Sequence, residues 1–296
     1  MKFGVMFANV GPYVEPDMAA AFGRIAEEHG IESLWAVEHV VVPADYQSQY
    51  PYSPSGRMPG AEESPIPDPL IWLTWVGAAT TTLRLATGIL ILPQRNPVIL
   101  AKELATLDVL SKGRVELGVG VGWLREEFDA LGIPFEGKGA RTEEYLAAML
   151  ALWTMDKPAF AGCLVSFAGI QAMPRPVQRP HPEIVFGGHT PAAFRRAARL
   201  AKGWYGFALD LDRTRACIEG LKTACATLGR SFDDVEVSVT PVPERGRAVL
   251  DLDGAQRFAE LGVRRLILYQ PRALDEAAML RLVEQVEREL IGKVSA

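Results

Sequence analysis

The feature that most constrains the fold of this chain is a regular alternation of short apolar runs with longer amphipathic segments. Short aliphatic and β-branched runs are typical of buried strands, whereas apolar residues spaced three or four apart are typical of helices. The expected strands cover residues 2–10, 33–41, 83–92, 115–121, 183–186, 203–209, 235–240 and 264–269. The expected helices cover 15–29, 68–81, 97–110, 141–153, 191–201, 213–228, 253–261 and 275–290, with a short helical turn at 126–131.

These strand and helix pairs predict an α/β fold, a single (β/α)8 TIM barrel over residues 1–296. Near-continuous apolar strands indicate a parallel sheet covered by helices, and eight pairs favour a closed barrel over an open doubly wound sheet. Two insertions interrupt the repeat. Residues 43–67, after the second strand, are either a lid or a disordered insert, and residues 159–173, before the fifth strand, are expected to form a hairpin. The active site of such a barrel lies at the carboxyl ends of the strands.

Composition and charge argue against several classes of protein. The 31 basic residues do not gather in a stripe and the net charge is -5, so nucleic acid is not an expected partner. Residues 1–10 enter a strand without a signal-peptide pattern, and no apolar run is long enough to cross a membrane, so we expect a cytoplasmic protein. Cys163, Cys217 and Cys225 lack metal-ligand spacing and are expected to be reduced, structural thiols.

The fourth predicted strand carries glycines at alternate positions, Gly118, Gly120 and Gly122. Three glycines on one face of a strand would leave a shelf without side chains, which a flat ligand or a neighbouring backbone can approach closely. The alternative is that the glycines only relieve crowding at a corner of the barrel. Spacing alone does not separate these two interpretations.

The exit of the fifth strand reads F-G-G-H-T-P. Thr190 is placed to cap the following helix and Pro191 to begin it. The amides of Gly188, His189 and Ala192 would then point out of the positive end of the helix, an arrangement that suits a phosphate. A well-capped helix without a ligand is the alternative.

Glu38 and His39 are expected to end the second strand, at the rim where catalysis takes place. Consecutive strand residues face opposite sides, so one of the two enters the barrel mouth, and we favour His39 because histidine exchanges protons near neutral pH. Glu38 would orient His39 or meet solvent; a structural role for the histidine is the alternative. His29, His181 and His189 do not form a ligand-spaced set with His39, so no metal site is expected.

Several stretches together resemble the bacterial luciferase-like superfamily: L-W-A-V-E-H, T-G-I-L-I-L-P-Q-R-N-P, R-V-E-L-G-V-G-V-G-W-L-R-E-E-F and F-G-G-H-T-P followed by A-K-G-W. More closely, the chain is similar to the branch that depends on the deazaflavin coenzyme F420. This resemblance implies a (β/α)8 barrel that binds F420 or FMN, with the ring at the carboxyl mouth and the phosphate at the exit of the fifth strand. It also suggests a homodimer.

The resemblance assigns roles to individual positions. His39 matches a histidine that acts as base beside the reactive ring in sugar-phosphate dehydrogenases of the family. Gly88 and Ile89 match a pair that forms a non-proline cis peptide behind the ring, although Gly88 could be an ordinary strand-end glycine. The phosphate loop matches Gly187, Gly188, His189 and Thr190, and the ring pocket would be lined by Gly120, Gly122 and Trp123.

Two positions depart from the family pattern. Glu38 stands where close relatives usually carry aspartate, a mild change. Trp123 stands where the sugar-phosphate dehydrogenases have a glutamate acid, which argues against that substrate and mechanism. A tryptophan at this position would pack on a ring or substrate, or else serve as a buried core indole.

The leading hypothesis is an F420-dependent oxidoreductase that exchanges a hydride with a small organic substrate. The second is an FMN-dependent monooxygenase supplied by a separate flavin reductase, and the third, of another class, is a non-catalytic flavin-binding protein. An unrelated barrel lyase or isomerase is more distant. Candidates to hold a long anionic cofactor tail are Arg95, Lys102, Arg175, Arg179 and Arg196, unless these are simply solvated surface residues.

Overall fold

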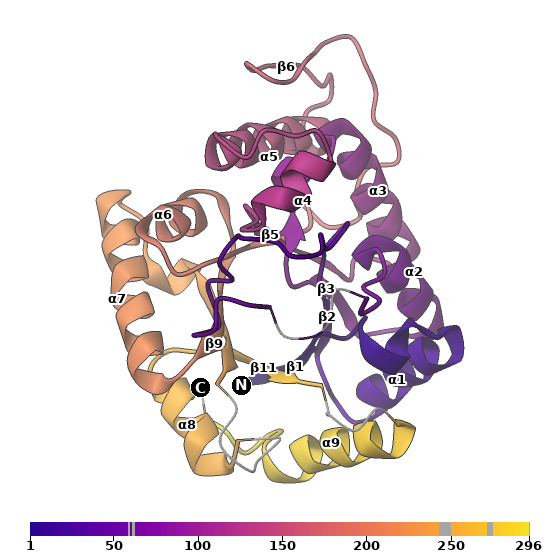
Figure 1. Ribbon diagram of the computed structural model, residues 1–296, viewed down its shortest axis with the longest axis vertical. Helices are drawn as coiled ribbons and strands as arrows, with labels where there is room; N and C mark the ends of the chain where they lie inside the picture. The colour runs from indigo at the N-terminus through magenta and orange to yellow at the C-terminus, as the bar shows by residue number, and fades with distance from the viewer. Residues whose placement is uncertain (59, 61–62, 243–249, 271–274, 296) are drawn as a thin grey trace.

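The computed structural model describes residues 1–58, 60, 63–242, 250–270 and 275–295, and in these residues the predicted closed parallel barrel is confirmed. The strands lie in the order β3-β2-β1-β11-β10-β9-β8-β5-β4, and β3 also pairs with β5, which closes the ring (Figure 1). Their bounds are β1 Lys2–Met6, β2 Ser33–Ala36, β3 Arg84–Thr87, β4 Leu90–Ile91, β5 Val115–Gly120, β8 Glu183–Gly187, β9 Gly203–Leu209, β10 Glu236–Pro241 and β11 Arg265–Tyr269.

The helices form the outer layer of the barrel, as predicted (Figure 1). Their bounds are α1 Pro16–Glu28, α2 Pro69–Ala79, α3 Pro97–Leu110, α4 Arg125–Ala130, α5 Lys138–Thr154, α6 Pro191–Leu200, α7 Leu211–Thr227, α8 Leu252–Glu260 and α9 Glu276–Glu289. Short 3-10 helices cover η1 Gly11–Val14, η2 Leu92–Gln94 and η3 Phe232–Asp234. Side chains that accept hydrogen bonds from first-turn amides fix many helix starts, among them Asp68, Asn96, Thr190 and Asp210.

Two predicted strands differ from those observed. The second strand ends at Ala36 rather than residue 41, because the Val37 amide donates to the Asn9 side chain (2.8 Å) and the Val40 amide to Glu127 (2.7 Å) instead of to a neighbouring strand. The third is divided into β3 and β4 at Gly88–Ile89, whose peptide bond is cis, as the resemblance implied. Because both parts pair with β5, the barrel still has eight positions.

The hydrophobic residues pack in two layers. The larger lies mainly between the strands and the surrounding helices. The smaller fills the barrel itself and consists of Met6, Trp35, Ala86, Val185, Tyr205 and Ile267. The interior is therefore packed core rather than a pore.

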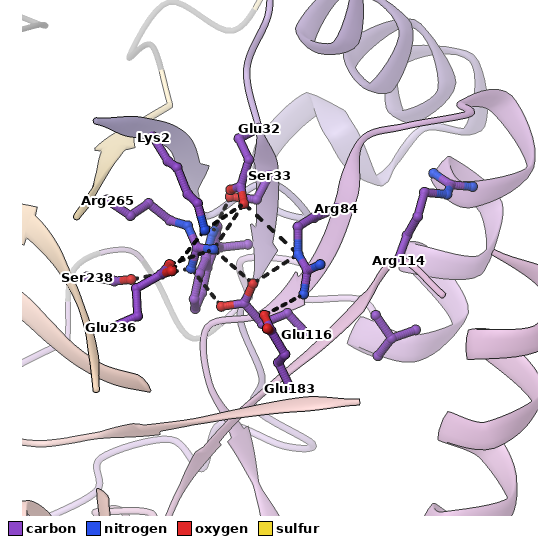
Figure 2. A network of polar contacts seen from close by, with 12 residues as sticks. Lys2, Glu32, Ser33, Arg84, Arg114, Glu116, Glu183, Glu236, Ser238 and Arg265 are labelled. Carbon is purple, nitrogen blue, oxygen red and sulfur yellow. Dashed lines mark hydrogen bonds and ion pairs between the residues drawn. The ribbon is translucent and has the colours of Figure 1, made fainter. Parts of the chain in front are cut away.

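A network of charged side chains lies at the strand beginnings (Figure 2). Arg265, which is 1% exposed, pairs with Glu116 (2.6 Å), and with Glu32 and Glu236 (3.0 Å each). Arg84 pairs with Glu116 (3.2 Å). Burial alone would lower the pKa of Arg265, but the surrounding carboxylates raise it above its usual value. We call this set, with Lys2 and Glu183, the amino-end charge network.

Both predicted insertions are ordered where the structure describes them. Residues 159–173 contain the expected antiparallel hairpin, β6 Phe160–Ala161 and β7 Ser166–Phe167. The described part of 43–67 crosses the carboxyl end of the barrel (Figure 1). This segment is therefore a lid, and the alternative of a disordered insert is wrong for its described residues.

Candidate active site

His39 lies in the loop after β2 and is oriented by Glu127 of α4. The His39 Nδ1 and Glu127 Oε2 atoms are 3.1 Å apart, and the second Glu127 oxygen accepts a hydrogen bond from the Val40 amide (2.7 Å). Glu127 is fully buried. A carboxylate at Nδ1 holds the proton on that nitrogen and leaves Nε2 as the basic atom of the neutral ring.

Glu127 was not identified from the sequence. It is the second glutamate of W-L-R-E-E-F, in the first turn of a helix, where an acidic residue is ordinarily explained by the helix dipole. Its partner is 88 positions away. Nothing in the local pattern indicates that contact.

Glu38 does not fit either role expected for it. It is buried and accepts hydrogen bonds from the amide of Ile91 and from Nε of Arg95 (2.7 Å). Burial raises the pKa of Glu38, and the charge of Arg95 opposes that shift. Arg95 pairs with Asp68 as well. Glu38 therefore anchors β4 and the start of α2, and His39 is oriented by another residue.

The glycines of β5 do not form an empty shelf. A Cβ on Gly118 would lie 1.9 Å from the carbonyl oxygen of Thr87, and one on Gly120 would lie 1.7 Å from Cδ1 of Ile89. A Cβ on Gly187 of β8 would lie 3.1 Å from Cγ2 of the same isoleucine. At Gly118 and Gly120 the crowding alternative is therefore correct, because the missing side chains make room for the Gly88–Ile89 bulge.

Gly122 has a different role from the other two glycines. Its φ of +75° lies in the left-handed region that favours glycine, and its carbonyl accepts a hydrogen bond from Lys138 Nζ (2.7 Å). The turn it makes presents Trp123 to the mouth. The Trp123 ring lies 5.9 Å from that of His39, 5.5 Å from Tyr46 and 5.1 Å from Tyr50.

The lid is fastened to α4 by Glu126. This carboxylate accepts hydrogen bonds from the Gln47 amide (2.6 Å) and the Ser48 hydroxyl (2.7 Å). Its pKa is about 2, because these hydrogen bonds outweigh the opposing effect of burial. Glu126 therefore stays ionised, and the attachment persists, throughout the neutral range.

The exit of β8 has the cap geometry that the sequence predicts. The Thr190 hydroxyl accepts from the Ala193 amide (3.2 Å), and Gly188 has a φ of +114°. His189 Nε2 accepts from the Phe207 amide (3.1 Å). Burial, then the charge of Arg213, lowers the pKa of His189 to about 4, so its ring is neutral at pH 7.

The five candidates for a cofactor tail each have a partner within the protein. Arg95 pairs with Glu38, Lys102 donates to the Met173 carbonyl, Arg175 to the Met155 carbonyl (2.6 Å), Arg179 to the Pro176 carbonyl, and Arg196 pairs with Glu143 (3.0 Å). Their geometry singles out none of them as a ligand for the tail. Within the described ranges, no helix could cross a membrane and no group of three metal-ligating side chains is brought together.

The sequence matches the family described as luciferase-like monooxygenase over residues 1–243. The chain belongs to this family. An uncharacterized protein of Mycobacterium tuberculosis is 35% identical to this luciferase-like chain over 281 residues, 94% of this chain and 95% of the relative. The FMNH2-dependent dimethylsulfone monooxygenase of Pseudomonas putida is 32% identical over 179 residues, 58% of this chain and 49% of that protein.

A solved structure shows the same fold at lower identity. The coenzyme F420-dependent tetrahydromethanopterin reductase of Methanopyrus kandleri superposes with a TM-score of 0.78, at 17% identity over 99% of both chains. Family membership makes this protein a luciferase-like oxidoreductase or monooxygenase.

Proposed function

We propose that this luciferase-like protein is an F420-dependent oxidoreductase that transfers a hydride between the deazaflavin and a small organic substrate. The observation that carries the proposal is the His39 and Glu127 pair at the barrel mouth, beside Trp123 and under the lid. Similarity to an F420-dependent reductase of the same fold supports the choice of cofactor.

The residues at the mouth fit a flat cofactor with a phosphate. Ile89 of the cis bulge, seated among Gly118, Gly120 and Gly187, would support one face of the ring. The left-handed turn at Gly188 and the amide of Ala192 in the first turn of α6 would receive the phosphate, since Pro191 has no N–H and the Ala193 amide donates to Thr190. When bound, the deazaflavin supplies or accepts the hydride.

The protein contributes orientation, proton transfer and exclusion of water. Glu127 holds the Nδ1 proton of His39, so Nε2 can accept a proton from a substrate hydroxyl or return one to a substrate oxygen. The lid, held by Glu126, keeps bulk water from the reacting atoms. Glu38 supports this arrangement indirectly by fixing β4.

An FMN-dependent monooxygenase with a separate reductase is the second candidate, favoured by the similarity to an FMNH2-dependent enzyme. Titration of the purified apo-protein with F420 and FMN, followed by fluorescence and binding heat, separates the two. We expect tight binding of F420 and weak binding of FMN. The reverse preference would favour the monooxygenase, and binding of neither would overturn both. A non-catalytic flavin-binding protein would bind a cofactor yet show no turnover on any substrate.

We also propose a homodimer, formed through the exposed apolar face of α2 and α3. Exposed side chains on this face are Ile71 (74%), Trp75 (54%), Ile99 (59%) and Leu110 (64%). The two helices are neighbours on one side of the barrel (Figure 1). Large apolar side chains exposed on neighbouring helices are typical of an interaction site.

Replacing Ile71 with glutamate is expected to dissociate that dimer. At a two-fold interface the new carboxylate would be buried close to the same carboxylate of the partner subunit, with no cation to compensate either charge. The free energy of dimer formation would therefore become much less favourable. Light scattering after size exclusion should change from about twice 32.3 kDa to 32.3 kDa. Leu228→Glu, at an exposed apolar residue on another face, is the control and should not change the mass. A wild-type monomer, or an Ile71→Glu dimer, would contradict the proposal.

A further inference from the structure

The lid places two tyrosines in a continuous series of aromatic rings over the barrel mouth. Tyr50 packs against Trp123 (5.1 Å) and against Tyr52 (5.4 Å). Tyr52 packs against Phe207 (5.3 Å), which in turn lies 6.0 Å from Tyr269 at the end of β11. Phe7, the residue after β1, completes the series, with its ring 5.8 Å from that of Tyr269. We call this set the aromatic mouth: Phe7, Tyr50, Tyr52, Trp123, Phe207 and Tyr269.

No member of the aromatic mouth carries a charge that would compensate an anion, and Arg213, whose charge acts on the adjoining His189, has a side chain that is 71% exposed. All six of its members are neutral side chains, and His189, which packs on Tyr52 at 5.2 Å, is neutral because burial lowers its pKa to about 4. Arg57 is exposed, lies over the ring of Tyr46 and donates to the Tyr46 carbonyl. A carboxylate or phosphate moved into these rings would lose its hydration without gaining a partner.

The hydroxyls of Tyr50 and Tyr52 are available as donors. Tyr205, deeper in the barrel, shares a hydrogen bond with the Thr240 hydroxyl (2.7 Å), whereas within the described ranges the Tyr50 and Tyr52 hydroxyls make no hydrogen bond. Burial, and then the neighbouring tyrosine hydroxyls, raise the pKa of Tyr50, and burial raises that of Tyr52. Both phenols therefore remain protonated, and able to donate, well above neutral pH.

We propose that the aromatic mouth is the substrate site, and that it selects a neutral, planar, largely apolar molecule whose carbonyl or ether oxygen accepts a hydrogen bond from Tyr50 or Tyr52. The rings supply stacking area, and the phenols supply a direction-dependent hydrogen bond. This inference rests on the proposed function, since it places the substrate on the side of the mouth covered by the lid.

Three probes that share one ring system test the proposal: 2-acetylnaphthalene, 2-ethylnaphthalene and 2-naphthoate. Each is titrated by calorimetry into the cofactor-loaded protein, and again into the protein without cofactor. We expect the ketone to bind about fivefold more tightly than the ethyl compound, as one neutral hydrogen bond allows. It should bind at least about tenfold more tightly than the carboxylate. Equal or tighter binding of the carboxylate would overturn the proposal.

Phenylalanine variants separate the hydroxyl from the ring. Tyr50→Phe with Tyr52→Phe should weaken the ketone about fivefold and leave the ethyl compound unchanged. Tyr145→Phe, which removes a hydroxyl from α5 outside the mouth, is the matched control and should change neither. An equal loss for both probes would show ring packing alone and contradict the hydroxyl role. Cofactor affinity is measured first, so that failure of this inference can be distinguished from failure of the proposed function. If the protein binds the cofactor but does not discriminate among the three probes, only the proposed substrate class is refuted.

Discussion

Replacing His39 with asparagine is expected to lower turnover by about 100-fold or more while leaving cofactor affinity nearly unchanged. The asparagine amide can still donate to Glu127, so the buried carboxylate keeps its partner, but the basic Nε2 atom is lost. Stopped-flow measurement of cofactor oxidation or reduction, together with a cofactor titration, checks both halves of the prediction. Retained turnover would contradict a proton-transferring role. Loss of cofactor binding would instead indicate a structural histidine.

Glu127→Gln provides the matched test of how His39 is held. The glutamine oxygen can still accept from the Val40 amide, but its NH2 group would face Nδ1 and force the proton of the neutral imidazole onto Nε2. Turnover should fall by about tenfold or more, with little change in cofactor affinity. A Glu127→Gln variant as active as the wild type would contradict this orientation of His39.

The second large effect is expected at the opposite end of the barrel. Arg265→Met should reduce the free energy of unfolding by about 3 to 5 kcal/mol, because it leaves the buried Glu116 with Arg84 as its remaining close cation. Urea unfolding measures the loss. Lys222→Met, which breaks an exposed pair with Glu219, is the control and should cost less than about 1 kcal/mol.

The loss at Arg265 should also depend on pH. Burial raises the pKa of Glu116 even with both arginines present, and removing one of them raises it further. A carboxyl group whose folded pKa is raised favours the folded state at low pH, and that stability is lost as the pH rises through the folded pKa. The deficit of Arg265→Met relative to the wild type should therefore be larger at neutral than at acidic pH. A deficit that is the same at both would contradict the uncompensated-carboxylate explanation.

Local sequence signals predicted most of the fold because the elements are locally consistent. Asp68, Asn96 and Thr190 each stand before a proline and cap a helix that begins where expected. The predicted second strand is too long because the valines at 37, 40 and 41 fit a strand, yet the side chains of Asn9 and Glu127 accept hydrogen bonds from the Val37 and Val40 amides. Hydrogen-bond acceptors that are distant in the sequence cannot be predicted from the hydrophobic pattern of the strand itself.

The site could be predicted only in part. Its position, His39 and the cap at Thr190 follow from the barrel and from local chemistry. The glycines at 118 and 120 were identified, but whether their free space admits a ligand or a neighbour depends on Ile89, which comes from another strand. Its position after the second strand predicts Glu38 to be a residue of the catalytic rim, whereas in the structure it is buried and paired with Arg95, 57 positions away.

Two adjacent carboxylates in α4 bind different parts of the candidate site. Glu126 fastens the lid through Gln47 and Ser48, and Glu127 fastens the base, His39. One peptide unit therefore joins the segment proposed to meet the substrate to the side chain proposed to move the proton. An exchange of lids between relatives, made to change which substrate the protein accepts, would have to preserve the hydrogen bonds that residues 47 and 48 donate to Glu126. Without these hydrogen bonds, a lid chosen for specificity would also disturb the helix that orients His39.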